Sequence, residues 1–256
     1  MELSGKTAIV TGSAVGVGRA TALELARRGA NVVVNYSRSE AEARQTAADI
    51  QALGAEALVV PADVSQDSQV REMVERTVDR FGGVDVLVNN AAITYFVDFR
   101  DLEGLTEEMW DRILAVNVKG VFFCSRAVVP AMKQQGAGCI VNISSVAGIR
   151  GGAGSSIAYC ASKAAVINLT MAFARAFAPE VRVNCVAPGF IDTRWHSARP
   201  EVTDYDALKG LVAQGTPLAR VCTPGDIAQV VLSLIEGADF VTGQTIVADG
   251  GGLMRG

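Results

Sequence analysis

The sequence predicts an α/β fold, a doubly wound parallel sheet with helices on both faces. Short apolar runs rich in β-branched residues alternate with longer amphipathic segments along the chain. Continuous apolar strands separated by helices are typical of a sheet that is buried on both faces. The chain has 256 residues, with no fixed short repeat and no linker rich in proline, glycine or serine. We therefore expect a single domain over residues 1–256.

Seven runs have the length and composition of strands, and six segments have those of helices. The expected strands are Thr7–Val10, Asn31–Asn35, Glu56–Pro61, Asp85–Asn89, Gly138–Ser144, Val181–Ala187 and Gln244–Ala248. The expected helices are Gly16–Arg28, Glu40–Leu53, Asp67–Phe81, Thr106–Gln134, Tyr159–Phe177 and Pro224–Glu236.

The segment from Arg194 to Gly215 breaks this alternation, because it is polar and contains Trp195 and His196. It follows the sixth strand at the carboxyl end, where open α/β sheets place their ligand crevice. We expect a mobile segment that covers a substrate, with an ordinary surface excursion as the alternative.

Composition argues against several classes of protein. The net charge is −4 and no long basic run occurs, so neither nucleic acid nor an anionic membrane surface is an expected partner. The longest uncharged stretch, Gln134–Ile149, is shorter than the ~20 apolar residues of a membrane-spanning helix. The N-terminus lacks the pattern of a signal peptide, and the five cysteines form no C-x-x-C pair. With a single histidine as well, we expect a soluble cytoplasmic protein with reduced thiols and no metal site.

The first strand leads into a glycine-rich loop with Gly12, Gly16 and Gly18, and a helix follows. Glycines let the backbone turn sharply and bring its N–H groups near a pyrophosphate, and the start of the helix favours an anion. A loop of this kind after the first strand of a βαβ unit predicts a dinucleotide site.

The end of the second strand bears on which dinucleotide is bound. An acidic residue there would hold the adenosine ribose and repel a 2′-phosphate, but Asn35 is neutral. Ser37 follows, and Arg38 can pair with a phosphate. These residues favour NADP(H), with NAD(H) as the alternative if Arg38 is only a solvated residue at a helix start.

Tyr159 and Lys163 are four positions apart, so on a helix they share one face. A neighbouring ammonium is expected to lower the pKa of the tyrosine from about 10 toward a value useful for proton transfer. Upstream, a strand ends in Ser144 and Ser145, where a hydroxyl could polarise a substrate carbonyl. Asn117 lies in an apolar helical stretch, and its amide has either a structural role or a water-holding one.

Together these motifs resemble the short-chain dehydrogenases/reductases over nearly the whole chain, and within them the bacterial 3-oxoacyl-[acyl-carrier-protein] reductase and glucose-dehydrogenase-like group. The motifs are Thr11-Gly12-x3-Gly16-x-Gly18, Asp63-Val64, Asn89-Asn90-Ala91-Ala92, Asn117, Ser145, Tyr159-x3-Lys163 and Pro188-Gly189-x3-Thr193. The resemblance implies a Rossmann fold with a seven-stranded sheet and a homotetramer. It also implies hydride transfer between NAD(P)(H) and a small-molecule carbonyl or secondary alcohol, such as a 3-oxoacyl thioester, a sugar or a ketone.

The resemblance also implies roles for the site residues. Tyr159 is the acid in reduction and the base in oxidation, and Lys163 binds the nicotinamide ribose and lowers the tyrosine pKa. Ser145 orients the carbonyl, and Asn117 holds a water that relays protons to Lys163. The residues expected to bind the cofactor are Gly12, Ser13, Gly16, Val17, Gly18, Asn35, Ser37, Arg38, Asp63, Val64, Asn90, Ala91, Tyr159, Lys163, Pro188, Gly189, Ile191 and Thr193.

The chain departs from the family pattern at three places. Ala92 replaces the usual glycine, the glycine-rich loop has no basic residue, and one extra residue separates Ser145 from Tyr159. A non-catalytic NAD(P)-binding regulatory or scaffolding protein is the alternative function. An epimerase or dehydratase on a related fold would need a longer chain.

Overall fold

The computed structural model describes residues 1–197 and 202–254. All seven strands belong to one parallel sheet with the order β3-β2-β1-β4-β5-β6-β7. The strands are β1 (Thr7–Val10), β2 (Asn31–Tyr36), β3 (Ala57–Pro61), β4 (Val86–Asn89), β5 (Gly138–Ile143), β6 (Val181–Pro188) and β7 (Thr245–Ala248). The chain builds outward from β1 to β3 and then returns to start the second half at β4. The switch point of this doubly wound sheet therefore lies between β1 and β4, as the predicted fold requires.

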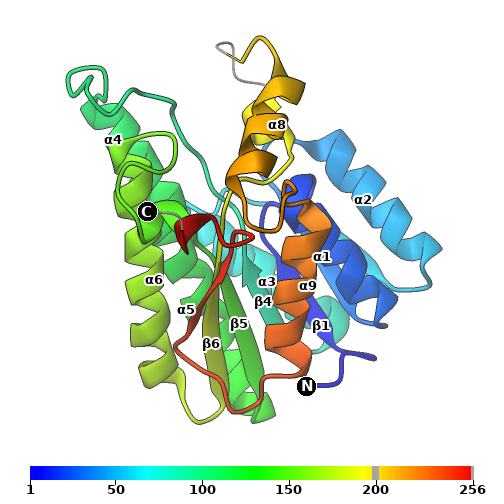
Figure 1. Ribbon diagram of the computed structural model, residues 1–256. Helices are drawn as coiled ribbons and strands as arrows, with labels where there is room; N and C mark the ends of the chain where they lie inside the picture. The colour runs from blue at the N-terminus through cyan, green and yellow to red at the C-terminus, as the bar shows by residue number, and fades with distance from the viewer. Residues whose placement is uncertain (198–201, 255–256) are drawn as a thin grey trace.

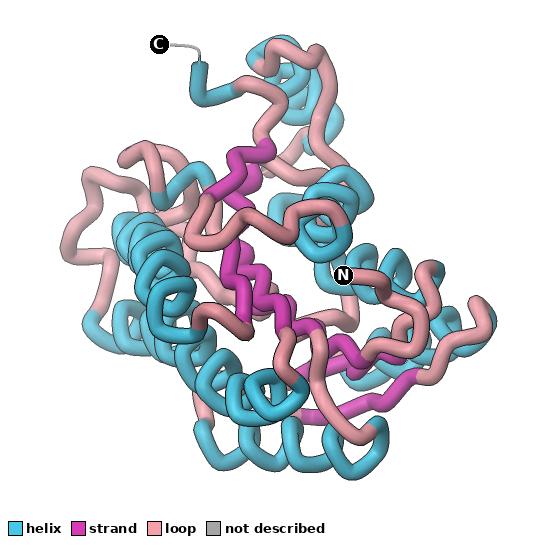
Figure 2. The backbone as a smooth tube through the Cα atoms, turned by 90° about the horizontal axis from the view of Figure 1, so that it is seen from below, coloured by secondary structure: helices cyan, strands magenta, loops and turns pink. Residues whose placement is uncertain are grey.

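Two layers of helices cover the sheet (Figures 1 and 2). On one face, α1 (Gly16–Arg27), α2 (Glu40–Ala52) and α9 (Pro224–Glu236) bury their apolar sides in one core. On the other face, α3 (Asp67–Phe81), α5 (Gly120–Gln135) and α6 (Ile157–Phe177) bury theirs in a second core. The central strands are buried on both sides, which explains why their sequences are continuously apolar.

The expected helix Thr106–Gln134 is interrupted. The structure has α4 (Glu107–Leu114), then a π-helical turn at Ala115–Lys119, and then α5. Asn117 lies in that turn and is buried. Single π turns are rare and are frequent at functional sites.

Two helices in the segment 194–215 were missed by the sequence prediction. They are α7 (Arg194–Ser197) and α8 (Tyr205–Gly215), and residues 198–201 between them lie outside the described part of the chain. The side chain of Asp204 caps α8 by accepting from the N–H of Ala207. Tyr205, Leu208 and Val212 of α8 have the spacing of one helix face and are half-buried, but none of the residues of α8 is buried, so the helical pattern of this short segment is weak. Figure 1 shows α8 standing above the carboxyl end of the sheet.

Candidate active site

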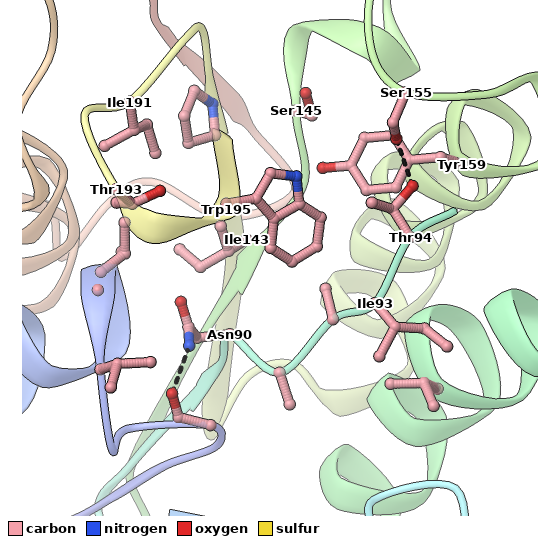
Figure 3. A pocket seen from close by; sticks show the side chains of 18 of the residues that line it. Asn90, Ile93, Thr94, Ile143, Ser145, Ser155, Tyr159, Ile191, Thr193 and Trp195 are labelled. Carbon is pink, nitrogen blue, oxygen red and sulfur yellow. Dashed lines mark hydrogen bonds between the residues drawn. The ribbon is translucent and has the colours of Figure 1, made fainter. Parts of the chain in front are cut away.

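A cavity of about 980 Å³ opens at the carboxyl ends of the strands. Its wall is built from the loops that follow β1 to β6 and from residues of α4, α7 and α8, and Figure 3 shows its central part. Of the eighteen positions expected to bind the cofactor, all but Ser13 and Gly18 line it. Among the described residues, no group of three or more His, Cys, Asp or Glu side chains is placed to hold a metal ion.

The glycine-rich loop is fixed from two sides. From β4, the Asn90 side chain donates to the carbonyls of Thr11 (2.9 Å) and Gly12 (3.2 Å). Thr11 in turn accepts from the N–H groups of Asn90 and Ala91 through its hydroxyl. Gly12 has a φ of +62°, and a Cβ on Gly18 would lie 2.5 Å from the Gly12 carbonyl oxygen. Helix α1 therefore begins close against the loop, a packing that only glycine allows at position 18.

Asn35 and Ser13 support this loop from below. Asn35 is 1% exposed; its side chain accepts from the N–H of Gly12 and donates to the carbonyl of Ala62 (3.0 Å). Ser13 is fully buried and donates to the Val10 carbonyl. These side-chain hydrogen bonds of Asn35 and Ser13 are thus all made to other groups of the protein. The neutral side chain of Asn35 serves the loop rather than a ribose.

The adenosine end of the cavity carries most of its charge. Arg38 is exposed there and has no hydrogen bond or ion pair within the described structure. Asp63 accepts from the Ser65 hydroxyl (2.7 Å) and from Arg112 (3.0 Å). Burial opposes ionisation of Asp63, but the bonds from Ser65 and Arg112 outweigh it and lower the pKa of this carboxyl. Arg38 is therefore the cation left available to a ligand at this end.

Tyr159 lies near the start of α6, where Ser156 caps the helix by accepting from the N–H of Tyr159 (3.3 Å). The hydroxyl of Tyr159 points toward the side of the cavity where Ser145 lies (Figure 3), and Ser145 is close enough to act on the pKa of the phenol. The neighbouring Ser144 is buried and donates to the carbonyl of Lys163 (2.7 Å). Of the two serines at the end of this strand, Ser145 is thus the one that faces the tyrosine.

Lys163 is 3% exposed, and its ammonium donates to the carbonyl of Ile143 (2.9 Å). The ammonium nitrogen is also 5.6 Å from the centre of the Tyr159 ring. Burial lowers the pKa of Lys163 to about 8. A buried amine with this pKa sits directly beside the phenol, as the spacing predicted.

The expected direction of the tyrosine shift was wrong for this structure. Burial raises the pKa of Tyr159 to about 12, although the bond to Ser145 acts in the lowering direction. Desolvation of the phenolate dominates, since the lysine ammonium is directed to the Ile143 carbonyl. Spacing along a helix sets which side chains are neighbours, whereas the pKa depends on how much water reaches the ring.

The side chain of Asn117 forms hydrogen bonds to a loop and to a helix. Its amide donates to the Ile93 carbonyl (3.0 Å) and the Ser162 hydroxyl (3.0 Å), and its oxygen accepts from the Ile93 N–H (2.9 Å). Both amide hydrogens are therefore used. Ser162, which the sequence analysis did not single out, links this group to α6 by donating to the Tyr159 carbonyl (2.7 Å). Its position three residues after the tyrosine is the signal that could have found it.

Aromatic groups form the other end of the cavity. Trp195 projects from α7 toward Tyr159, with 6.1 Å between the ring centres (Figure 3). His196 stacks on Phe190 with 4.1 Å between the ring centres. Arg194 pairs with Glu42 (3.1 Å) and donates to Ser39 (3.2 Å). Its charge is directed to α2.

A glycine-rich dinucleotide loop, an open cavity and a serine–tyrosine–lysine cluster at the carboxyl end of a doubly wound sheet together define an oxidoreductase that uses a nicotinamide cofactor. The family described as enoyl-(acyl carrier protein) reductase matches residues 12–252 of the chain. The chain belongs to the short-chain dehydrogenase/reductase family.

Relatives with assigned functions agree with this family. The 3-oxoacyl-[acyl-carrier-protein] reductase FabG of Staphylococcus epidermidis is 41% identical over 250 residues, which cover 96% of this chain and 98% of that protein. The protein of the same name from Thermotoga maritima is 41% identical, with 98% and 99% covered. A short-chain type dehydrogenase/reductase from Mycobacterium marinum has a crystal structure with a TM-score of 0.85 and 34% identity, with 98% and 96% covered. The chain is thus an NAD(P)(H)-dependent oxidoreductase that acts on a carbonyl or alcohol, and NADP(H) as the favoured cofactor is consistent with these relatives.

Proposed function

We propose that the protein reduces a ketone to a secondary alcohol with NADPH, and that Tyr159 donates the proton. The observation that carries this proposal is that Tyr159 and Ser145 line the same cavity as neighbours, with the buried ammonium of Lys163 beside the Tyr159 ring. A carbonyl oxygen bound between the two hydroxyls could accept a hydrogen bond from each.

The cavity fits a dinucleotide. The loop Thr11–Gly18 lies at the start of a helix and is held open by Asn35 and Asn90, and the unpaired Arg38 suits a 2′-phosphate. NADPH bound here would supply the hydride. The residues we propose to hold it are Gly12, Gly16, Val17, Ser37, Arg38, Asp63, Val64, Asn90, Ala91, Lys163, Pro188, Gly189, Ile191 and Thr193, with Ser13, Gly18 and Asn35 shaping the loop.

The remaining residues act on the protons and on the carbonyl. Ser145 orients and polarises the carbonyl, and Tyr159 gives its proton to the carbonyl oxygen as the hydride adds to the carbon. Lys163 stabilises the phenolate that remains and is proposed to bind the nicotinamide ribose. Asn117 holds Ile93 and Ser162 in place through both of its amide hydrogens. We therefore propose that any relay water is bound by the side-chain oxygen or the backbone carbonyl oxygen of Asn117.

We further propose a cytoplasmic homotetramer. Two helical segments of the described chain, Glu107–Gln135 and Ile157–Phe177, are long and apolar enough to span a membrane, but both pack on the sheet. Their outer faces expose Phe122 and Met171, and the edge strand β7 exposes Ile246 and Val247. Apolar groups gathered on two separate faces suit two interfaces between copies better than a lipid contact.

The substrate class and the covering segment are also part of the proposal. Because both named relatives are 3-oxoacyl-[acyl-carrier-protein] reductases, a ketone with an ester or thioester two carbons away is the first class to test. Residues 194–215 are proposed to cover the bound substrate, since α7 lines the cavity and α8 packs above it.

The test compares single substitutions in NADPH oxidation with a panel of ketones, 3-oxoacyl thioesters and sugars. We expect Tyr159→Phe to lower kcat by about 10²–10⁴-fold with little change in the Kd for NADPH, because one hydroxyl is removed. The adjacent serines give a matched pair: Ser145→Ala should lower kcat, whereas Ser144→Ala should mainly lower stability. Turnover of Tyr159→Phe at the wild-type rate would overturn the proposal.

A further inference from the structure

The substrate end of the cavity is dominated by one large side chain. The carbonyl oxygen must lie at the hydroxyls of Tyr159 and Ser145, so the groups attached to the carbonyl carbon reach into the space beside Tyr159. The indole of Trp195 borders that space, 6.1 Å from the phenol between ring centres and tilted by 53° (Figure 3). Trp195 is only half-buried, so part of a large apolar surface faces a cavity that takes up a substrate.

The position of this indole is fixed by its neighbours in the chain. Arg194 is tied outward to Glu42 and Ser39 on the side of α2. His196 is stacked on Phe190, with the two rings within 20° of parallel. Tyr205 adds a further tie by donating to the carboxylate of Asp192 (2.9 Å), just before α7. The contacts of residues before and after Trp195 in the chain therefore hold its indole in position as one wall of the cavity.

Charge is absent from this wall within the described structure. The charged residues that line the cavity are Arg38, Asp63, Arg112, Lys163 and Arg194. The first three lie at the adenosine end, Lys163 bonds to the Ile143 carbonyl, and Arg194 is paired with Glu42. Two hydroxyls near the tyrosine, those of Thr94 and Ser155, bond to each other (Figure 3). The groups around the substrate carbonyl thus leave little to recognise a sugar hydroxyl or a carboxylate.

We propose that Trp195 determines specificity by stacking on an apolar ring attached directly to the substrate carbonyl, so that the preferred substrates are aryl or alicyclic ketones. This inference rests on the proposed function and names its substrate class. Offset or tilted aromatic contacts at such distances add to the gain from burial. The apolar face of the indole offers no hydrogen-bond partner by which a hydroxyl of a polyhydroxylated substrate could be recognised.

The experiment uses two 3-oxoesters that differ only in the group on the ketone, phenyl in one and methyl in the other. With wild-type protein and NADPH, the phenyl compound should have a KM about tenfold lower, as expected for one buried ring. Trp195→Ala should remove this preference by raising the KM of the phenyl compound about tenfold. Trp195→Phe keeps a ring and should retain most of the preference.

Two outcomes separate this inference from the proposed function. If the wild type reduces both ketones but Trp195→Ala changes KM equally for both, the specificity role is wrong and the reductase stands. If no ketone is reduced, the proposed function is wrong. Binding of the phenyl and methyl compounds then tests by itself whether Trp195 stacks on the ring. The chain has two tryptophans, so a Trp110→Phe variant reports on Trp195 alone. Quenching of its fluorescence by the phenyl compound and not by the methyl compound supports the stacking, and equal or no quenching overturns it.

Discussion

The two ends of the cavity are built in different ways. At the cofactor end, the side chains of Asn35 and Asn90 bond to the backbone of the glycine-rich loop, and the Thr11 hydroxyl accepts from the backbone N–H of Ala91. All of these residues lie on or beside the central strands. At the substrate end, the wall comes from α7 and α8, and it is held by ring contacts and by exposed ion pairs. None of the residues of α8 is buried.

Because of this difference, the shape of the cofactor end is fixed, whereas the shape of the substrate end can vary. Buried polar groups must be paired, so a change in one strand residue at the cofactor end disturbs several bonds at once. Surface helices held by a few contacts can be altered without unfolding the sheet. The shape of the cofactor end is thus suited to one ligand, while the substrate end can be adapted to another carbonyl compound.

The largest expected effect concerns Lys163, where the two ends meet. Its pKa is about 8 in the folded protein, below its ordinary value of 10.5, so the unfolded chain binds more protons between these two values. Stability should therefore rise with pH in this window, and the cost of burying the charge is fully present below pH 8. Relative to Lys163→Met, the wild type should gain about 3 kcal/mol in unfolding free energy across the whole window.

Urea unfolding of both proteins at several pH values from 7 to about 10 measures this gain as it develops. The window stops there because Tyr159, whose pKa is raised to about 12, begins to cost stability above its ordinary value of 10. Lys209→Met serves as a control, since Lys209 pairs with Asp206 at the surface and has a raised pKa. A difference between wild type and Lys163→Met that does not change with pH would show that the amine is not desolvated.

The next effect tests how little the glycine-rich loop at the cofactor end can shift. In Gly18→Ala the new methyl group would lie 2.5 Å from the Gly12 carbonyl oxygen and 2.6 Å from the Asn90 amide. We expect a loss of about 1–3 kcal/mol in stability and weaker binding of NADPH, because the loop must shift. Gly210→Ala is the matched change in α8, where nothing lies within 4 Å, and it should be neutral or slightly stabilising. Equal effects of the two changes would contradict the contrast between the ends.

A smaller effect is expected at Arg38. Arg38→Gln should raise the Kd for NADPH about tenfold and leave the Kd for NADH nearly unchanged, because only NADPH has the 2′-phosphate. Arg175→Gln, at another exposed arginine, is the control. Fluorescence titration of both nucleotides checks this. A parallel change for both would assign Arg38 to some part of the cofactor that they share.

The sequence predicted the central part of the molecule well, for a physical reason. Strands such as Thr7–Val10 and helices such as Asp67–Phe81 were predicted with their observed bounds, because burial of one face or both imposes a period on the sequence. Tyr159 and Lys163 were found because one helical turn brings them together. These features depend on residues that are near one another along the chain.

Features that depend on distant contacts were not predictable. The inward direction of Asn35 follows from bonds to Gly12 and Ala62, and the π turn at Asn117 accompanies bonds to Ile93, 24 positions away. The raised pKa of Tyr159 results from burial by several segments, which spacing does not show. Helix α8 has no buried residue, so the apolar spacing of Tyr205, Leu208 and Val212 forms only a weak pattern.

The smallest effect concerns the ion pair that ties the two ends together. Arg194 of α7 pairs with Glu42 of α2 across the mouth of the cavity, and the two side chains are 55% and 45% exposed. Exposed pairs contribute little, so Arg194→Gln should change stability by less than about 1 kcal/mol. Because the pair holds the segment that carries Trp195, the same change should nevertheless raise KM for a ring-bearing ketone by about two- to threefold, and more weakly at high salt, where the pair is already screened.

A double-mutant cycle with Glu42→Gln isolates the pair from other roles of the arginine. Arg44→Gln is the control, because Arg44 forms a similar exposed pair with Glu40 but within α2 alone. If the KM effect of Arg194→Gln persists unchanged in the Glu42→Gln background, the arginine acts through Ser39 or on the substrate directly. If it disappears there, the tie to α2 positions Trp195, and the adaptable end of the cavity is set by a contact with the fixed one.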